Sequence, residues 1–129
     1  MDRIKDLLRK ILNAQGNEIL FAYLFGSRAA NESTYPPRDI DLAVYFQPTG
    51  IPPFDAKLEL HGTLSRALRT NDIDILVLNN AQNLVLLSEI IRKGVVLIDR
   101  DPDFREEFEQ GIIHQAIDFK SQRISLIGF

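Results

Sequence analysis

An unbroken apolar run of seven residues, Ile19 to Phe25, constrains the fold more than any other part of the sequence. The run is too short for most helices and is typical of a strand buried in a sheet. It is also the longest such run in the chain, whereas a helix needs about 20 apolar residues to span a bilayer. The sequence therefore predicts a protein built around a small buried sheet, without a membrane span.

Helical and strand patterns alternate along the rest of the chain. Apolar residues at helical spacing between Ile4 and Leu12 predict an amphipathic helix that ends near Gly16. Further helices are expected from Asp55, as N-cap, to about Thr70, from Leu84 to Lys93 with Gly94 as the C′ residue, and from Asp101 and Pro102 through the C-terminal region. Further strands are expected over residues 40–46, 72–78 and 95–98. The alternation predicts one α/β domain over residues 1–129, in which a small sheet carries helices on at least one face.

Composition narrows the chemistry that such a domain can carry out. The chain has no cysteine, which excludes disulfides, zinc–thiolate sites, iron–sulfur clusters and thiol nucleophiles and leaves oxygen or imidazole as metal ligands. Its 18 acidic and 15 basic residues give a net charge of −3, which argues against a general nucleic-acid-binding protein. The first residues lack the apolar segment and cleavage site of a secretory signal. We therefore expect a cytoplasmic protein that binds neither membrane nor nucleic acid.

Acidic residues are concentrated at the beginnings of two expected strands. Asp39 and Asp41 flank Ile40 where the second strand begins, and Asp74 lies in the third strand. Residues two apart in a strand point to the same face, with their Cα atoms about 7 Å apart, so Asp39 and Asp41 can converge on one point. Two like charges on one face are unfavourable unless a cation compensates them. Carboxylate oxygens in this arrangement suit Mg²⁺ bound together with phosphate, so we expect a phosphate compound as the substrate.

A short turn after the first strand supplies the complementary groups. Gly26 lets the backbone approach a phosphate closely, and Ser27 offers a hydroxyl and a backbone N–H. Arg28 follows the turn and is a candidate contact to a nucleotide, although a surface ion pair explains it equally well. Each pattern alone is common, in turns or at solvated strand ends. Together they indicate a site that binds phosphate and metal.

This combination of motifs resembles the DNA polymerase β-like nucleotidyltransferase superfamily. The motifs that carry the resemblance are Gly26-Ser27-Arg28-Ala29, Asp39-Ile40-Asp41-Leu42 and Ile73-Asp74-Ile75. Within the superfamily the chain is most similar to the minimal nucleotidyltransferases of the MntA type, the antitoxin partners of HEPN-domain toxins. The resemblance covers essentially the whole chain. It implies an α/β (α+β) nucleotidyltransferase fold with a small mixed sheet, flanking helices and a long C-terminal helix.

The resemblance also implies a reaction, namely transfer of AMP from ATP to an acceptor hydroxyl with release of pyrophosphate. In MntA-type proteins the acceptor is a tyrosine of the HEPN toxin, a ribonuclease that the modification silences. By this resemblance, Gly26 and Ser27 hold the triphosphate, and Asp39 and Asp41 bind Mg²⁺. Asp74 completes a site for two metal ions and helps to deprotonate the attacking hydroxyl. A hetero-oligomer with the toxin is the expected assembly.

The chain departs from the family pattern in the loop between the motifs. Eleven residues, 28–38, separate the Gly-Ser pair from Asp39 where the family usually has ten, and Arg38 stands where serine is common. Arg38 can pair with the carboxylate of Asp39 and compete with a metal, or contact a phosphate. These departures leave open a degenerate antitoxin that neutralises its partner by binding alone. A nucleotidyltransferase for small molecules of the aminoglycoside type is the other alternative, although such enzymes generally carry an additional helical domain.

Other polar residues have less specific interpretations. Asp72 lies two residues before Asp74, so in a strand both side chains would point to the same face. Asp74 is preferred as the site residue because the resemblance aligns it and because the sequence around Asp72 is typical of a turn. His61 and His114 lie in separate expected helices, each without a second ligand four residues away. A structural or surface role is therefore expected for both histidines.

Overall fold

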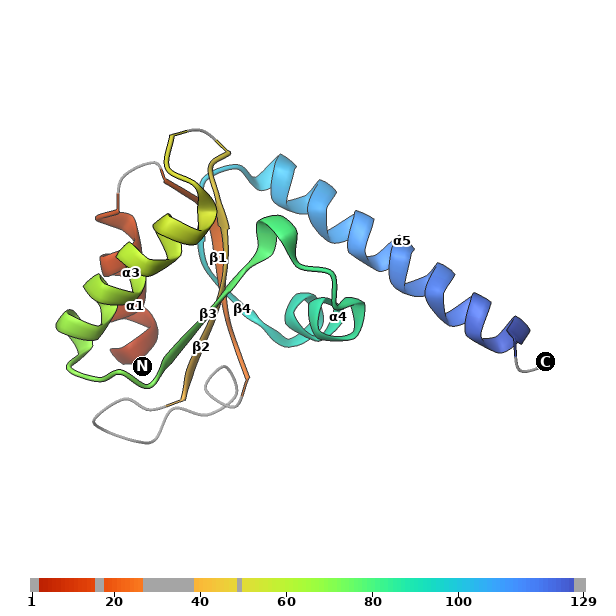
Figure 1. Cartoon of the computed structure of the whole chain (residues 1–129), viewed down its shortest axis with the longest axis horizontal. Helices are drawn as coiled ribbons and strands as arrows, with labels where there is room; N and C mark the ends of the chain where they lie inside the picture. The colour runs from red at the N-terminus through yellow and green to blue at the C-terminus, as the bar shows by residue number, and fades with distance from the viewer. Residues whose placement is uncertain (1–2, 16–17, 27–38, 49, 127–129) are drawn as a thin grey trace.

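The computed structural model describes residues 3–15, 18–26, 39–48 and 50–126, with side chains up to residue 119 (Figure 1). At its centre is a 4-stranded sheet in the order β3-β2-β1-β4. β1 (Ile19–Phe25) is antiparallel to both of its neighbours, β2 (Ile40–Phe46) and β4 (Val95–Asp99). β3 (Ile73–Val77) is parallel to β2 and forms one edge of the sheet. The predicted α/β class and the mixed sheet are therefore confirmed.

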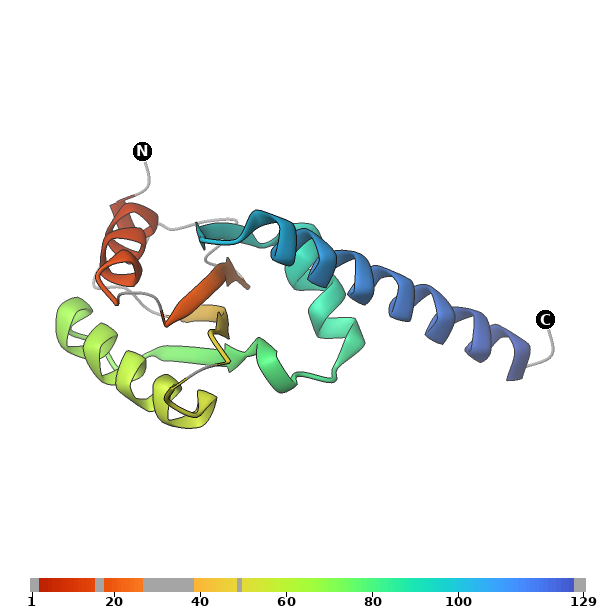
Figure 2. The same cartoon turned by 90° about the horizontal axis from the view of Figure 1, so that it is seen from above.

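Helices cover both faces of this sheet (Figure 1 and Figure 2). α1 (Arg3–Asn13) and α3 (Pro53–Leu68) pack on one face. α4 (Leu84–Lys93) and α5 (Pro102–Leu126) cover the other. β1 lies in the middle with six of its seven residues buried, which accounts for its apolar sequence on both faces. The sequence predicted helices on at least one face, and the structure has them on both.

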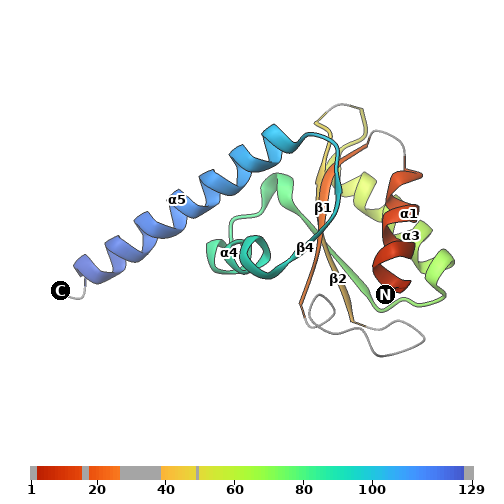
Figure 3. The same cartoon turned by 180° about the vertical axis from the view of Figure 1, so that it is seen from behind.

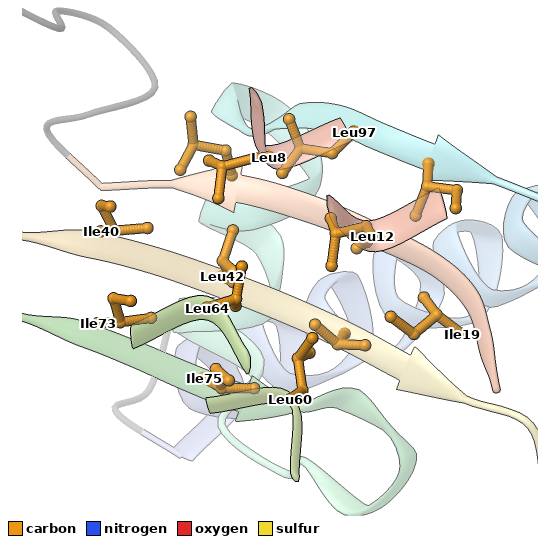
Figure 4. Close-up of a cluster of buried hydrophobic side chains, with 14 of the residues drawn as sticks. Leu8, Leu12, Ile19, Ile40, Leu42, Leu60, Leu64, Ile73, Ile75 and Leu97 are labelled. Atoms are coloured by element: carbon orange, nitrogen blue, oxygen red, sulfur yellow. The ribbon is translucent and has the colours of Figure 1, made fainter. Parts of the chain in front are cut away.

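The larger core lies between the sheet and the pair α1 and α3. Leu8 and Leu12 of α1 and Leu60 and Leu64 of α3 meet alternate residues of the strands there (Figure 4). The labelled strand residues in that view are Ile19, Ile40, Leu42, Ile73, Ile75 and Leu97. The helical spacing in α1 and the alternation in β2 therefore both arise from burial against this one face.

The second core, under α4 and α5, is rich in aromatic rings. Phe21 and Tyr45 stack with ring centroids 5.2 Å apart, and Phe104 of α5 packs edge-on against Tyr45 at 5.1 Å. Phe108, one turn further along α5, contacts Phe21 at 5.5 Å. These ring contacts fix the beginning of α5 on the sheet.

Four polar side chains, which we call the α5 clasp, add hydrogen bonds to this packing. The hydroxyl of Tyr23 on β1 donates to Glu109 of α5 at 2.6 Å. Arg105 donates to Asp99 on β4 at 2.7 Å and to Glu109 at 2.9 Å. Burial, followed by the hydrogen bond and charge of Glu109, raises the pKa of the Tyr23 hydroxyl well above its usual range. The clasp holds the first half of α5, and the second half extends away from the sheet (Figure 3).

The second half of α5 and the outer side of α4 line a groove with a volume of about 550 Å³. Its lining includes Val85, Ile117 and Phe119, whose side chains are 66%, 57% and 44% exposed. Because these three side chains line the same groove, they are not isolated exposed residues. No helix in the described ranges is long and apolar enough to cross a membrane.

The beginnings of two helices test the predicted caps. α5 begins as expected, because the N–H of Phe104 donates to the Asp101 carboxylate at 3.1 Å and Pro102 occupies the first helical position. The prediction of Asp55 as N-cap is wrong: α3 begins at Pro53, with Pro52 at the N-cap position and no side-chain cap. Proline starts a helix without a cap because its fixed φ suits the first turn and its missing N–H needs no acceptor.

The ends of β3 and α4 also differ in detail from expectation. β3 stops at Val77, and a 3-10 helix, η1 (Leu78–Asn80), replaces the predicted last strand residue. Gly94 ends α4 as predicted but has φ −71°, outside the left-handed region typical of a C′ glycine. A Cβ at this position would lie 2.4 Å from the carbonyl oxygen of Ile90. Space, and not a positive φ, therefore requires glycine there.

Candidate active site

Two of the predicted acidic residues are direct neighbours in the sheet. Asp41 on β2 is in register with Asp74 on β3 and with Phe25 at the end of β1. Side chains of paired strand residues lie on the same face of a sheet, so the two carboxylates share the face that α4 and α5 cover further along. Short strands that begin at the same level therefore bring Asp41 and Asp74 together, as the sequence predicted.

The electrostatics of Asp41 reflect this crowding. Partial burial raises the pKa of the Asp41 carboxyl, and the negative charges of Asp74, Asp39 and Asp72 raise it further, in that order. Like charges on one face of a sheet are unfavourable. The cluster is consequently arranged to gain from a bound cation.

Gly26 brings the end of β1 against the same carboxylate. Its φ is +75°, in the region that favours glycine, and a Cβ built on it would lie 2.5 Å from Oδ2 of Asp41. Two independent requirements, backbone conformation and space, thus select glycine at this position. The turn that the sequence predicted for phosphate binding therefore begins beside the acidic cluster. Ser27 and Arg28, its other members, lie outside the described residues, as does Arg38.

Asp39 differs from the expected strand geometry. β2 begins at Ile40, and Asp39 just before it has φ 53°, a left-handed conformation that aspartate tolerates better than most residues. The rule that places residues two apart on one strand face does not apply to a residue in this conformation. Asp39 still acts on Asp41, because its charge contributes to the raised pKa of the Asp41 carboxyl.

The structure also separates Asp74 from Asp72. Asp72 precedes β3, its carbonyl accepts a hydrogen bond from the N–H of Ile40, and its own N–H donates to the side chain of Thr70. Asp74 is the residue in register with Asp41, and its charge has the larger effect on the pKa of Asp41. Asp74 is therefore the better candidate of the two for a shared site.

The carboxylates of this cluster are candidate ligands of a divalent cation. Within the described ranges, no group of three or more His, Asp or Glu side chains is close enough together to hold a metal ion by itself. Mg²⁺ requires less, because it usually takes one or two carboxylates and completes its octahedron with water and substrate phosphates. Asp41 and Asp74, neighbours whose charges repel, fit that requirement.

The histidines do not join this cluster. Nε2 of His61 lies 3.2 Å from the carbonyl oxygen of Ile73, and its Nδ1 lies 3.4 Å from the hydroxyl of Ser65. His61 thus connects α3 to the outer side of β3. His114 is exposed on α5. The expected structural role of His61 and surface position of His114 agree with these contacts.

Comparison with known proteins adds the decisive observation. Residues 6–103 match the family model described as polymerase beta, nucleotidyltransferase. The chain belongs to the polymerase beta nucleotidyltransferase family. The predicted relationship and the enzyme class, nucleotidyltransferase, are confirmed. A search of curated protein sequences gave no match.

Several of the solved structures similar to this family member are toxin–antitoxin complexes. A toxin–antitoxin structure with AMP-PNP has a chain 27% identical, with a TM-score of 0.72 and coverage of 95% of this chain and 94% of that one. The tri-AMPylated Shewanella oneidensis HEPN toxin in complex with MNT antitoxin has a chain 26% identical, with a TM-score of 0.68 and coverage of 95% and 92%. The toxin–antitoxin MntA-HepT has a chain 25% identical, with a TM-score of 0.67 and the same coverage.

Proposed function

We propose that this nucleotidyltransferase is a Mg²⁺-dependent adenylyltransferase that transfers AMP from ATP to a hydroxyl, most simply a tyrosine, of a HEPN-type toxin. By modifying the toxin, the protein would act as its antitoxin in the cytoplasm. The observation that carries the proposal is the register of Asp41 with Asp74, with Gly26 against the same carboxylate. The similarity to toxin–antitoxin structures, one of them with an AMPylated toxin, supports the choice of nucleotide and partner.

In this proposal the residues of the motifs form two groups, one for the nucleotide and one for the metal. Gly26, Ser27 and Arg28 bind the triphosphate, the first two through backbone N–H groups and the Ser27 hydroxyl. Asp39, Asp41 and Asp74 would hold Mg²⁺, and a bound Mg²⁺ would neutralise charge on the phosphates and on the leaving group.

The reaction itself is an in-line displacement at phosphorus. The acceptor oxygen forms a bond to the α-phosphorus, and the bond from that phosphorus to the bridging oxygen of the β-phosphate breaks. Pyrophosphate carries away the electron pair, and Asp74 accepts the proton of the acceptor hydroxyl. Asp41 and Asp39 fix the nucleotide relative to Asp74, so loss of either should lower the rate and leave the fold intact.

The proposal is tested with purified protein, α-labelled ATP, Mg²⁺ and the toxin encoded beside it. We expect label to appear on the toxin and its ribonuclease activity to fall. Replacement of Asp41 by Asn should lower the rate by at least about a hundredfold, since a metal ligand contributes several kcal/mol of transition-state stabilisation. Transfer that persists at the wild-type rate in this variant would exclude the proposed chemistry.

Neutralisation by binding alone is the second candidate, motivated by the eleven residues between the motifs and by Arg38. The double replacement of Asp39 and Asp41 by Asn separates it from enzymatic neutralisation. If the double variant still protects cells from the toxin as well as the wild type does, binding alone is the mechanism. If protection disappears while the complex still forms, transfer of AMP is required.

A further inference from the structure

β3 is an edge strand, and its backbone has a defined outward side. The N–H of Ile40 donates to the carbonyl of Asp72, so the backbone groups of Asp72 face β2. Backbone groups alternate in direction along a strand, so Asp74 also faces β2, whereas Ile73, Ile75 and Val77 direct their N–H and C=O away from the sheet. The strand that carries Asp74 therefore offers hydrogen-bonding groups on its free side.

Only part of this free side is satisfied within the described residues. His61 bonds the carbonyl oxygen of Ile73 from α3 at 3.2 Å. No described group bonds the outward N–H or C=O of Ile75, the residue directly after Asp74. The unsatisfied stretch of the edge thus begins where the acidic cluster ends.

A pocket of about 320 Å³ adjoins that stretch, and we call it the edge pocket. Its walls are formed by the start of α3, by β3 and by the end of η1. They comprise Pro53, Phe54, Lys57, the β3 segment 75–77, Asn80 as the last residue of η1, and Ala81 after it. Phe54 is 65% exposed, although its ring has an apolar pocket beside it. An exposed aromatic ring beside unpaired strand groups is a typical arrangement for holding an extended peptide, whose backbone pairs with the edge and whose side chains enter pockets.

We propose that the free edge of β3 and the edge pocket bind an extended segment of the acceptor polypeptide as an added strand. An apolar side chain of that segment occupies the edge pocket, and its acceptor residue lies near Asp74. The strand rise of about 3.3 Å per residue puts Asp74 and Val77 about 10 Å apart, so the acceptor lies about three residues from the pocket side chain. This inference rests on the proposed function and names how its protein substrate is held.

The chemistry of the edge distinguishes this occupant from others. A helix satisfies its own backbone groups and offers none to Ile75. A second copy of the chain would pair through a strand of only 5 residues. The surface buried by such a short strand pair is far smaller than the roughly 800 Å² per partner that a stable dimer buries. Lys57 beside the edge also disfavours pairing with itself across a two-fold axis.

Two variants test the edge, and one serves as control. Phe54→Ala removes the exposed pocket wall. Val77→Pro removes an outward N–H at a residue whose φ of −81° suits proline, and leaves the hydrogen bonds to β2 in place. Leu58→Ala, one turn after Phe54 on α3 and 56% exposed, lies outside the pocket and controls for loss of apolar surface. Thermal unfolding identifies any variant that is not folded, and Phe54→Ala then decides alone.

The KM for the toxin, the toxin affinity without nucleotide and the affinity for ATP are measured for each protein. We expect Phe54→Ala and Val77→Pro to raise the KM and weaken toxin binding about tenfold, with ATP affinity unchanged and Leu58→Ala like the wild type. Unchanged KM and toxin affinity in both variants would overturn the inference, as would a wild-type dimer that Val77→Pro dissociates. If the wild type binds toxin but transfers no AMP, the proposed function fails, and the toxin affinities of the variants still decide the inference.

Discussion

Gly26 and Asp41 meet at a distance that permits no side chain on the glycine. The contact combines a positive φ with a carboxylate oxygen 2.5 Å from the position of a Cβ. Gly50 offers a comparison within the same chain, because its φ is +84° and nothing lies within 4 Å of its Cβ position. The two glycines share the backbone requirement and differ in the space available.

We predict that Gly26→Ala and Gly50→Ala both lower the free energy of unfolding by about 1 kcal/mol through the left-handed backbone. Gly26→Ala should cost more, because its methyl group displaces Asp41, and it alone should abolish AMP transfer. Urea denaturation of the two variants measures the difference. Equal losses of stability with equal activities would mean that the contact with Asp41 has no role.

The charged form of Asp41 carries an electrostatic cost in the folded protein. Its raised pKa means that the folded protein binds a proton there more tightly than the unfolded chain does. The charged carboxylate therefore lowers stability at neutral pH, and this cost disappears as the pH falls from the raised pKa to the ordinary one.

Asp41→Asn is accordingly predicted to raise the free energy of unfolding at pH 7, without Mg²⁺, by about 0.5 kcal/mol, while removing activity. The gain should shrink towards zero near about pH 3, where the wild-type carboxyl is protonated in both states. Denaturant titrations at the two pH values test this, with Asp118→Asn on the exposed side of α5 as control. A variant less stable than the wild type at pH 7 would contradict the account of the site.

At the scale of elements, side chains complete what the backbone leaves unfinished at the end of β2. The amide of Asn79 donates to the carbonyl of Phe46 at 2.8 Å and accepts from the N–H of the same residue at 2.9 Å. Asn79 thus replaces a strand residue after β3 has ended, and it fixes η1 against the sheet.

Asn79→Ala should lower the free energy of unfolding by about 2 kcal/mol, because it removes two hydrogen bonds from partly buried backbone groups. The exposed neighbour Asn80→Ala should change it by less than about 0.5 kcal/mol. Urea denaturation of both variants provides the comparison. Similar effects of the two replacements would show that the paired hydrogen bonds of Asn79 contribute little.

The α5 clasp gives a prediction at high pH. Because the pKa of Tyr23 is raised in the folded state, the unfolded chain loses this proton first, and stability falls as the pH rises above 10.0, the ordinary value. Tyr23→Phe has no hydroxyl to titrate, so this loss of stability at high pH is absent from the variant. We expect the variant to be less stable than wild type by about 1 kcal/mol at pH 8, and the difference to narrow at about pH 11. A constant difference between these pH values would rule out Tyr23 as the titrating group.

The elements could be predicted largely because their signals are local. The run in β1, the spacing in α1 and the Asp101-Pro102 pair each depend on burial or capping within a few residues. The start of α3 was predicted at Asp55 because aspartate is a common cap, whereas the structure uses the helix-starting conformation of Pro53. Strand order and the left-handed conformation of Asp39 depend on contacts between distant segments, for which the sequence has no local signal.

At the scale of the whole molecule, one sheet serves both as the centre of the fold and as the support of the site. Helices bury its two faces, while Asp41, Asp74 and Gly26 lie together at the ends of β1, β2 and β3. The register of Asp41 with Asp74 agrees with the acidic cluster expected from sequence, because strand pairing brings these two carboxylates to one edge of the sheet. Their metal-binding and catalytic roles stay predictions. The free edge of β3 and the edge pocket escaped sequence reasoning, because they exist only once α3 and β3 are assembled.

The central claim, that the acidic cluster transfers AMP to a protein partner, is tested most directly by the intact mass of the toxin. The toxin is incubated with ATP, Mg²⁺ and either the wild type or Asp74→Asn, with each protein confirmed as folded and able to bind the toxin. We predict a mass increase of one or more AMP units with the wild type and none with Asp74→Asn. An unmodified toxin with the wild type, or equal modification by Asp74→Asn, would contradict the claim.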